Sequence, residues 1–237
     1  MTKLSVNINK VALIRNARGE NLPDLVQFAM DCEEFGADGI TVHPRPDERH
    51  VRYDDLPKLK EVVQTELNIE GYPNDKFLSI VENIQPHQCT LVPDPPGVLT
   101  SSEGWNTKEH AAFLKETIQR LQAKSIRVSL FLNPDIEMVN YAKETGTDRI
   151  EFYTGTYAKN YIQDSQASIA SHIEAGKKAN ELSLGINAGH DLNLNNLKFY
   201  ASSISGLKEV SIGHALISDA LYFGLKNTIQ LYKRLLT

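Results

Sequence analysis

The sequence contains very little cysteine, and what it has is not arranged for cross-linking or for metal binding. Only Cys32 and Cys89 occur in 237 residues. Cys32 lies within a helical pattern and Cys89 within a strand-like run, and neither has a second ligand at the spacing of a metal site. A chain of this length can bury a sizeable core without disulfides. We therefore expect two buried, reduced thiols and no bound metal ion.

The chain also lacks an excess of basic residues and any long apolar run. Its 25 Lys and Arg against 30 Asp and Glu give a formal net charge of -5, so there is no basic surface of the kind that nucleic-acid binding requires. No apolar run approaches the ~20 residues of a membrane span. Residues 1–6 pass directly into a strand-like run without a secretion-signal pattern. We therefore expect a cytoplasmic protein that binds neither nucleic acid nor a membrane.

The chain does contain a regular alternation of short apolar runs and amphipathic stretches. The apolar runs, predicted as strands, are residues 4–9, 39–43, 67–70, 88–92, 127–132, 149–153, 185–187 and 209–212. The amphipathic stretches, predicted as helices, are residues 24–35, 54–65, 75–83, 107–124, 135–145, 165–184, 194–204, 214–224 and 225–236. Such alternation predicts an α/β protein with a parallel sheet.

The number of strand–helix units decides between two parallel-sheet architectures. Eight units of roughly 30 residues match a closed (β/α)8 TIM barrel of about 250 residues. A doubly wound open sheet is the alternative, but it usually has fewer strands, and no GxGxxG motif follows the first strand here. No change in composition marks a linker, so we predict one TIM-barrel domain over residues 1–237.

Two of the predicted strands end in a glycine followed by a histidine. Residues 185–190 read GINAGH, and residues 210–214 read VSIGH. Glycine lets the backbone approach a ligand closely, and a helix that begins just after it offers N–H groups and a positive dipole end to a phosphate. In TIM barrels the phosphate site frequently lies on the loops after the last two strands. The two glycine–histidine turns therefore predict a phosphorylated substrate.

Polar side chains also follow the other predicted strands, at the end where a barrel builds its active site. The strand-end residues are Asn7, Asn9, Lys10, His43, Glu70, Glu151, Asn187, His190 and His214. His43 and His190 titrate near neutral pH, and a partly desolvated Glu70 can act as a general base. Three further residues on loops at the same face suit phosphate binding: Arg18, Arg45 and His50. The set predicts acid–base chemistry on a phosphorylated molecule.

The longest predicted connection, residues 93–106, follows the fourth strand. It contains Pro93, Pro95, Pro96 and Gly97 near its start, Thr100 midway and the only tryptophan, Trp105, near its end. Loops this long in a compact domain are usually functional. We predict a lid that orders over the bound substrate.

Several motifs in the chain occur together in one known family. They are Asn7, the run RNARG at 15–19, GADGITVHPR at 36–45, DERH at 47–50, NAGH at 187–190 and IGHA at 212–215. With these motifs and compatible spacing along the chain, the sequence resembles the pyridoxine 5'-phosphate synthase family. The resemblance implies a barrel with extra helices, assembled as a homo-octamer. It also implies condensation of 1-deoxy-D-xylulose 5-phosphate with 3-amino-2-oxopropyl phosphate in vitamin B6 biosynthesis, without organic cofactor or metal.

The resemblance also implies roles for individual residues. His43 and Glu70 match the proton acceptors of the family, and His190 matches the proton donor. The positions that hold the aminoketone phosphate correspond to Asn7, Arg18, Gly213 and His214. Those that hold the deoxyxylulose phosphate correspond to Arg45, His50 and Thr100. Glu151 matches an active-site carboxylate whose role is left open.

The chain departs from the family's pattern at two places in the expected site. Asn9-Lys10 stands where many members have an Asp-His pair, and Asp191 stands where glycine is common. Lys10 can replace an imidazole as a hydrogen-bond donor. Asp191 can offer its backbone N–H, although its charge is unfavourable beside a phosphate unless the side chain points away. We still expect Asn9, Lys10 and Asp191 to contact substrate.

Two other functions compete with this interpretation. The first is a Schiff-base aldolase that uses Lys10, which borohydride trapping with a ketose phosphate would reveal. The second is a non-enzymatic barrel that serves as a sensor or scaffold. Such a barrel is expected to have lost its acid–base groups, whereas His43, Glu70 and His190 are all present.

Overall fold

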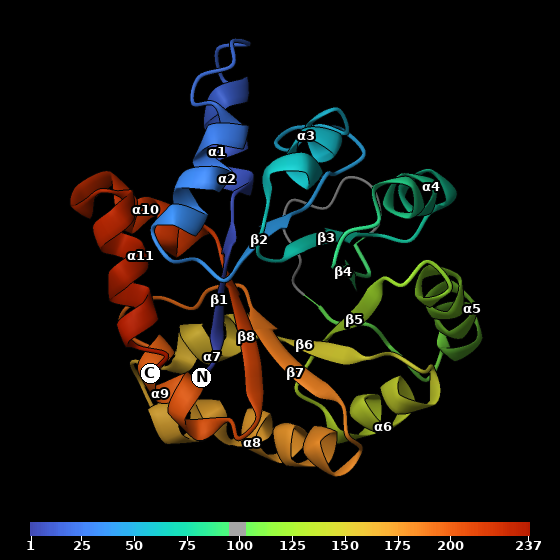
Figure 1. Ribbon diagram of the computed structural model, residues 1–237. Helices are drawn as coiled ribbons and strands as arrows, with labels where there is room; N and C mark the ends of the chain where they lie inside the picture. Colours follow the sequence, from blue (N-terminus) through green and yellow to red (C-terminus); the bar gives the residue numbers. More distant parts are fainter. Residues whose placement is uncertain (95–102) are drawn as a thin grey trace.

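Eight parallel strands close into a barrel in the computed structural model, which describes residues 1–94 and 103–237 (Figure 1). The strands are β1 (Lys3–Asn7), β2 (Gly39–Val42), β3 (Leu67–Gly71), β4 (Gln88–Leu91), β5 (Arg127–Leu132), β6 (Arg149–Tyr153), β7 (Gly185–Gly189) and β8 (Leu207–Ile212). Each strand pairs with its neighbours in sequence, and β1 pairs with β8 to close the ring. The predicted TIM-barrel fold is therefore confirmed. The middle of the predicted lid, including Thr100, lies outside the described residues.

Helices surround the ring of strands (Figure 1). They are α1 (Asn9–Asn16), α2 (Leu25–Glu34), α3 (Asp55–Val62), α4 (Asp75–Ile84), α5 (Ala111–Gln122), α6 (Ile136–Glu144), α7 (Gly155–Asn160), α8 (Ser165–Glu181), α9 (Leu197–Ser203), α10 (His214–Phe223) and α11 (Leu225–Arg234). The sequence patterns predict all of these except α1 and α7, which are two of the extra helices of the barrel. In the described part of the chain, none of the helices combines the length and apolar character that crossing a membrane requires.

The first strand ends earlier than its apolar pattern predicts. We expected it to run to Asn9, but β1 ends at Asn7 and α1 begins at Asn9. The Asn7 side chain accepts a hydrogen bond from the Asn9 backbone N–H (3.1 Å), which turns the chain out of the sheet. Val11, Ala12 and Arg15 then form the buried face of α1.

The strands place apolar side chains toward the helices and polar side chains toward the barrel axis. On the first two strands, Leu4, Val6, Ile40 and Val42 are fully buried in the apolar core. Between them in the sequence stand polar residues that meet across the strands. Ser5 and Thr41 share a hydrogen bond of 2.7 Å, and Thr90 donates to Asn68 at 3.1 Å. The interior of this barrel is therefore polar, where most TIM barrels have branched apolar side chains.

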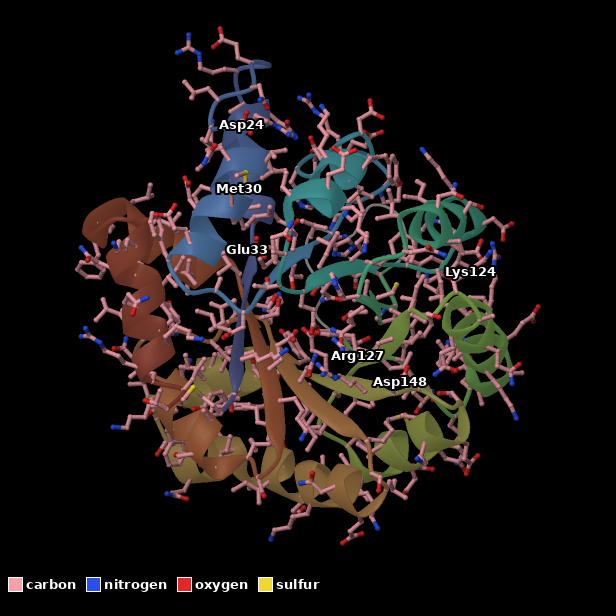
Figure 2. All side chains as sticks on the ribbon, viewed as in Figure 1. Asp24, Met30, Glu33, Lys124, Arg127 and Asp148 are labelled. Carbon is pink, nitrogen blue, oxygen red and sulfur yellow. The ribbon has the colours of Figure 1, made fainter. Side chains whose placement is uncertain are left out.

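Ion pairs occupy the amino-terminal end of the same interior. Arg127, labelled within the ring of strands in Figure 2, contacts Glu66 and donates a hydrogen bond to Gln88 (2.9 Å). On the next strand, the Arg149 guanidinium lies 3.6 Å from the Glu209 carboxylate and donates to Asn187 at 3.2 Å. The first pair of contacts links β5 to β4 and to the residue before β3, and the second links β6 to β7 and β8.

Side-chain caps fix where several helices begin. Asp24 accepts hydrogen bonds from two N–H groups of α2, and Asp135 accepts one from the first turn of α6. The cap of α4 is Asn74, whose side chain accepts from the N–H of Phe77 at 2.9 Å. Asp75 is the acidic residue of the first turn, where its charge suits the helix dipole.

A buried ion pair joins α1 to α3 on the outside of the barrel. The Arg15 guanidinium donates to both carboxylate oxygens of Asp55, at 2.7 and 2.9 Å. It also donates to the backbone carbonyl of His50 at 3.1 Å. Because His50 stands on the loop after β2, this pair fixes the loop that carries two of the predicted phosphate ligands.

We predict that Asp55→Ala lowers the free energy of unfolding by about 3 kcal/mol, because the buried Arg15 guanidinium loses its counter-charge. Urea unfolding followed by circular dichroism measures this difference. The matched control is Asp54→Ala, since Asp54 is exposed and makes no capping hydrogen bond with α3. Its effect should stay within about 0.5 kcal/mol. Equal effects of the two substitutions would contradict a structural role for the pair.

Candidate active site

A cavity of about 510 Å³ opens at the carboxyl ends of the strands. Its lining residues are Asn7, Asn9, Lys10, His43, Arg45, His50, Glu70, Val92, Phe131, Glu151, His190, Asp191, Ser211, Gly213, His214 and Ala215. All of the predicted site residues are among them except Arg18, Thr100 and Asn187. Side chains from both ends of the chain therefore meet in one site.

The three remaining predicted residues lie elsewhere. The Asn187 side chain lies in the barrel interior, where its oxygen accepts a hydrogen bond from Arg149 at 3.2 Å. Arg18 is exposed in the turn between α1 and α2, which stands out from the ring of helices in Figure 1, and it does not line the cavity. Thr100 lies outside the described residues.

The sequence did not identify four of the lining residues: Val92, Phe131, Ser211 and Ala215. Val92 and Phe131 look like core positions in the sequence, because apolar residues near strand ends usually pack under helices.

His43 and Glu70 form a buried acid–base pair in the cavity. The His43 Nδ1 atom lies 4.0 Å from the Glu70 carboxylate, and both side chains are buried. Burial, followed by the positive charge of Arg45, holds the pKa of His43 well below its usual value. Burial raises the pKa of Glu70 to about 8, with Arg45 opposing the shift and Asp94 supporting it. Near neutral pH His43 is therefore a neutral acceptor, and Glu70 can either hold or release a proton.

Asparagine side chains hold the backbone around His43. The Asn9 side-chain oxygen accepts a hydrogen bond from the His43 N–H at 2.9 Å. Asn7 in turn holds the N–H of Asn9. The start of α1 is thus tied to the end of β2, and the Asn9 oxygen is already engaged by the protein.

Two cationic or titratable side chains extend from the loop after β2. Arg45 donates a hydrogen bond of 2.9 Å to Asp94, and both side chains are buried. Burial and the nearby positive charges of Arg49 and Arg45 lower the pKa of His50 to about 4. The buried Nδ1 atom of His50 has no hydrogen-bond partner within the described protein. A polar ligand in the cavity would supply that partner.

Glu151 provides a second buried carboxyl group at the floor of the cavity. Its pKa is raised well above the usual value, chiefly by burial and then by the charge of Glu70. Gly189 faces this group, and a Cβ atom at that position would collide with the Glu151 carboxylate. A side chain at Gly189 would therefore displace the Glu151 carboxyl group from its present position.

The histidine of the first turn has an unusual backbone conformation. His190 has a φ of 87°, in the left-handed region that non-glycine residues seldom adopt. Its Nδ1 atom lies 2.9 Å from the Asp191 carboxylate, and its ring meets the Tyr153 ring edge-on at 5.2 Å. The contact with His190 lowers the pKa of Asp191. Strain of this kind is found at functional sites, where surrounding contacts hold it in place.

The second turn has the helix that the sequence predicts. Gly213 stands before the first residue of α10, so the N-terminus of this helix opens beside the cavity. A Cβ atom at Gly213 would lie 3.1 Å from the Asn7 backbone oxygen. After the first turn the predicted helix, residues 194–204, begins three residues later than predicted, at Leu197. Bends and turns held by Asn193 and Asn196 separate His190 from α9.

Over residues 1–94 and 103–237, no group of three or more His, Cys, Asp or Glu side chains is arranged to hold a metal ion. The groups that can bind an anion here are Arg45, His50, His214, Lys10 and the N-terminus of α10. The cavity can therefore receive anionic groups at two places, one beside β2 and one beside β8 and β1.

Comparison with known proteins assigns the chain to a family. Residues 4–237 match the family model described as pyridoxal phosphate biosynthesis protein PdxJ. A pyridoxine 5'-phosphate synthase of Bacteroides fragilis (strain YCH46) is 56% identical over 236 residues, which cover 100% of both chains. Another, of Cytophaga hutchinsonii, is 57% identical over 234 residues, which cover 99% of this chain and 98% of the relative.

Solved structures of similar shape show the fold alone, because their sequences are distant. Tryptophan synthase from M. tuberculosis, in an aminoacrylate-bound form, aligns with a TM-score of 0.66 at 14% identity over 100% of this chain and 94% of that one. Thiamine phosphate pyrophosphorylase from Pyrococcus furiosus aligns with a TM-score of 0.64 at 12% identity, covering 99% and 95%.

We predict that Glu70→Gln makes the protein more stable than the wild type above pH 8 but not near pH 4.5. Burial raises the pKa of Glu70 from 4.5 to about 8, so the folded protein favours the protonated carboxyl group, which glutamine imitates. The contribution of protonated Glu70 to the stability of the wild type is full below pH 4.5 and declines as the pH rises from 4.5 to about 8. Urea unfolding at several pH values measures the difference. Glu116→Gln, at an exposed position on α5, should show no such trend; a flat difference for Glu70→Gln would contradict the assignment.

Proposed function

This chain belongs to the PdxJ family of pyridoxine 5'-phosphate synthases, enzymes of vitamin B6 biosynthesis, and on that premise we propose how its cavity performs the reaction. The substrates are 1-deoxy-D-xylulose 5-phosphate and 3-amino-2-oxopropyl phosphate, and the products are pyridoxine 5'-phosphate, phosphate and water. The observation that carries the proposal is the convergence of two anion-binding regions on the buried pair His43 and Glu70. The whole chain, residues 1–237, acts as one catalytic domain.

The aminoketone phosphate binds where β8 and β1 meet. Its phosphate accepts hydrogen bonds from the first N–H groups of α10, at Gly213 and His214, and from the side chain of Asn7. The close approach of Gly213 to Asn7 leaves room for phosphate oxygens only because residue 213 has no side chain. The resemblance also implies Arg18 as a ligand of this phosphate. In the structure, however, Arg18 is exposed and does not line the cavity, so its role stays a prediction.

The deoxyxylulose phosphate binds on the other side, beside β2. Arg45 and His50 hold its phosphate, and the unpartnered Nδ1 of His50 accepts a hydrogen bond from a sugar hydroxyl or a protonated phosphate. Lys10 contributes a further cation at the cavity wall. Thr100, the third ligand implied by the resemblance, belongs to this side and lies outside the described residues.

The acid–base groups then act on the intermediate between the two phosphates. Attack of the amine on the ketone and the later eliminations all require proton transfers around one bound molecule. Neutral His43 accepts a proton, Glu70 takes part near its raised pKa, and His190 donates. Glu151, held protonated by burial, donates a hydrogen bond to oxygen that becomes negative during the reaction.

Asp191 acts on His190 in this scheme and not on a phosphate. Its carboxylate points at the imidazole, at 2.9 Å, and so orients the proton donor. The negative charge of Asp191, which is unfavourable beside a phosphate, therefore interacts with the His190 ring. Asn9, predicted to bind substrate, uses its side-chain oxygen to hold the His43 backbone and leaves only its amide nitrogen for a ligand.

The proposal also includes self-association and a cellular location. Exposed apolar side chains at the end of α10, Leu221 and Tyr222, support contacts between copies, and we infer a homo-octamer from the resemblance. Substrates that carry phosphate groups do not cross membranes readily, which supports a cytoplasmic enzyme. We infer that the reaction needs no organic cofactor or metal ion.

The direct test is incubation of the purified protein with both phosphorylated substrates. Formation of pyridoxine 5'-phosphate, followed by its absorbance and by mass, is the expected result. Borohydride treatment with the ketose phosphate alone should leave Lys10 unmodified. Covalent trapping of Lys10 without formation of pyridoxine 5'-phosphate would instead support an aldolase.

We predict that Glu70→Gln lowers kcat by about 10²–10⁴-fold, the usual contribution of a positioned acid–base group. Binding of each substrate should stay within a few-fold of the wild type, because glutamine has the shape of the protonated carboxyl group. Steady-state kinetics and calorimetric titration of single substrates measure the two effects. Near-normal turnover would remove Glu70 from the mechanism.

We predict that Gly213→Val weakens binding of 3-amino-2-oxopropyl phosphate at least tenfold more than binding of 1-deoxy-D-xylulose 5-phosphate. The new side chain must push against Asn7, where a Cβ atom alone already lies at 3.1 Å from the backbone oxygen. Calorimetric titration with each substrate separately gives the two dissociation constants. The second ligand serves as the control for folding, and equal losses for both would mean that the phosphates are assigned to the wrong sides.

A further inference from the structure

Two neighbouring apolar side chains interrupt the polar wall of the catalytic cavity. Val92 follows β4, and Phe131 belongs to β5, the next strand of the barrel. Each is almost fully buried, with 2% and 4% of its surface exposed. The other apolar lining residue in the described part of the chain, Ala215, stands on α10 beside the phosphate region of Gly213. We call Val92 and Phe131 together the apolar corner.

Position in the barrel places the apolar corner between the two buried carboxyl groups. The Val92 N–H donates to the carbonyl of Gly71, the residue after Glu70, at 3.0 Å. Phe131 stands opposite Glu151 in the pairing of β5 with β6. The Phe131 ring also packs against the ring of Tyr153 at 5.8 Å, which restricts its movement. Any part of a substrate that contacts this corner therefore lies next to the reacting groups.

An apolar corner in a polar cavity favours an apolar group of the ligand, because contact with it removes both surfaces from water. The two proposed substrates carry phosphate, hydroxyl, carbonyl and amine groups, and only one of them carries a methyl group. That methyl is C1 of 1-deoxy-D-xylulose 5-phosphate, and it is bonded to the carbonyl carbon that the amine attacks. The methyl group must lie beside the reacting carbonyl carbon. The apolar corner lies beside Glu70 and Glu151, so it is placed where the methyl group has to bind.

We propose that Val92 and Phe131 bind the C1 methyl group and thereby make the enzyme select a 1-deoxy ketose phosphate over the ketose phosphate that has a hydroxyl group at C1. This inference rests on the proposed function and adds the basis of its substrate specificity. A hydroxymethyl group in the corner would lose its hydrogen bonds to water without gaining partners there. A site of this kind discriminates against an added hydroxyl by roughly 10²-fold.

The test compares 1-deoxy-D-xylulose 5-phosphate with D-xylulose 5-phosphate as partners of 3-amino-2-oxopropyl phosphate. The wild type should show a ratio of kcat/KM of roughly 10² in favour of the deoxy sugar. Val92→Thr keeps the shape of the side chain and replaces one methyl group with a hydroxyl group, so the ratio should fall about tenfold. Val92→Ala remains apolar, and its ratio should stay within about threefold of the wild type. Thermal unfolding checks that each variant is folded.

The matched control is Ala215→Ser, which adds a hydroxyl group to the cavity wall at the phosphate side and should leave the ratio unchanged. A wild-type ratio near one overturns the inference, as does an unchanged ratio in folded Val92→Thr or an equal change in Ala215→Ser. If Val92→Thr does not fold, the wild-type ratio and the ratio of Phe131→Leu test the inference. Leucine is apolar, so Phe131→Leu should still prefer the deoxy sugar.

Calorimetric binding of the two ketose phosphates to the wild type separates this inference from the proposed function. Tighter binding of the deoxy sugar, without formation of pyridoxine 5'-phosphate in the complete reaction, would support the apolar corner and contradict the proposed function. Formation of pyridoxine 5'-phosphate together with equal turnover of both sugars would support the function and contradict the corner.

Discussion

Each strand of the barrel turns polar side chains toward the axis, and a buried polar group without a partner costs roughly 1–3 kcal/mol. Those side chains must therefore pair across the strands, as Ser5 does with Thr41 and Arg149 with Glu209. The apolar core then lies outside the ring, between strands and helices, where Leu4, Val6 and their equivalents are fully buried. Inside the ring, hydrogen bonds and ion pairs link β1 through β5 and β6 through β8, in addition to packing.

The active site is the open end of this polar interior. Glu70 and Glu151 continue the inward-facing rows of β3 and β6, and both line the cavity. Burial raises the pKa of both carboxyl groups, which makes them useful for proton transfer near neutral pH. The same burial is unfavourable for the folded state once Glu70 ionises, so stability and the proposed catalytic role make opposite demands on this residue.

Much of this arrangement could be predicted from the sequence. The bounds of β5 and β6 agree with their predicted ranges, because alternating apolar residues and flanking turn residues mark both ends. The polar strand-end residues were recognisable because the carboxyl ends of parallel strands converge in a barrel. The sequence pattern did not predict α1, since Asn9 and Lys10 look like a continuation of β1 until the Asn7 side chain is seen to hold the turn. It also did not predict α7, a helix of six residues that begins at a glycine.

The sequence by itself determined the barrel, the approximate places of its strands and most of the polar residues of the cavity. These follow from periodicity and from chain order, which are local properties. Only the tertiary structure decided that Asp191 contacts His190, that Asp94 pairs with Arg45 and that Val92 and Phe131 line the cavity. Each of these depends on the direction of a side chain relative to a distant strand or to the next turn of a loop. The sequence pattern of an apolar residue at a strand end is the same whether its side chain faces the core or the cavity. Only the closed barrel shows which of the two it faces.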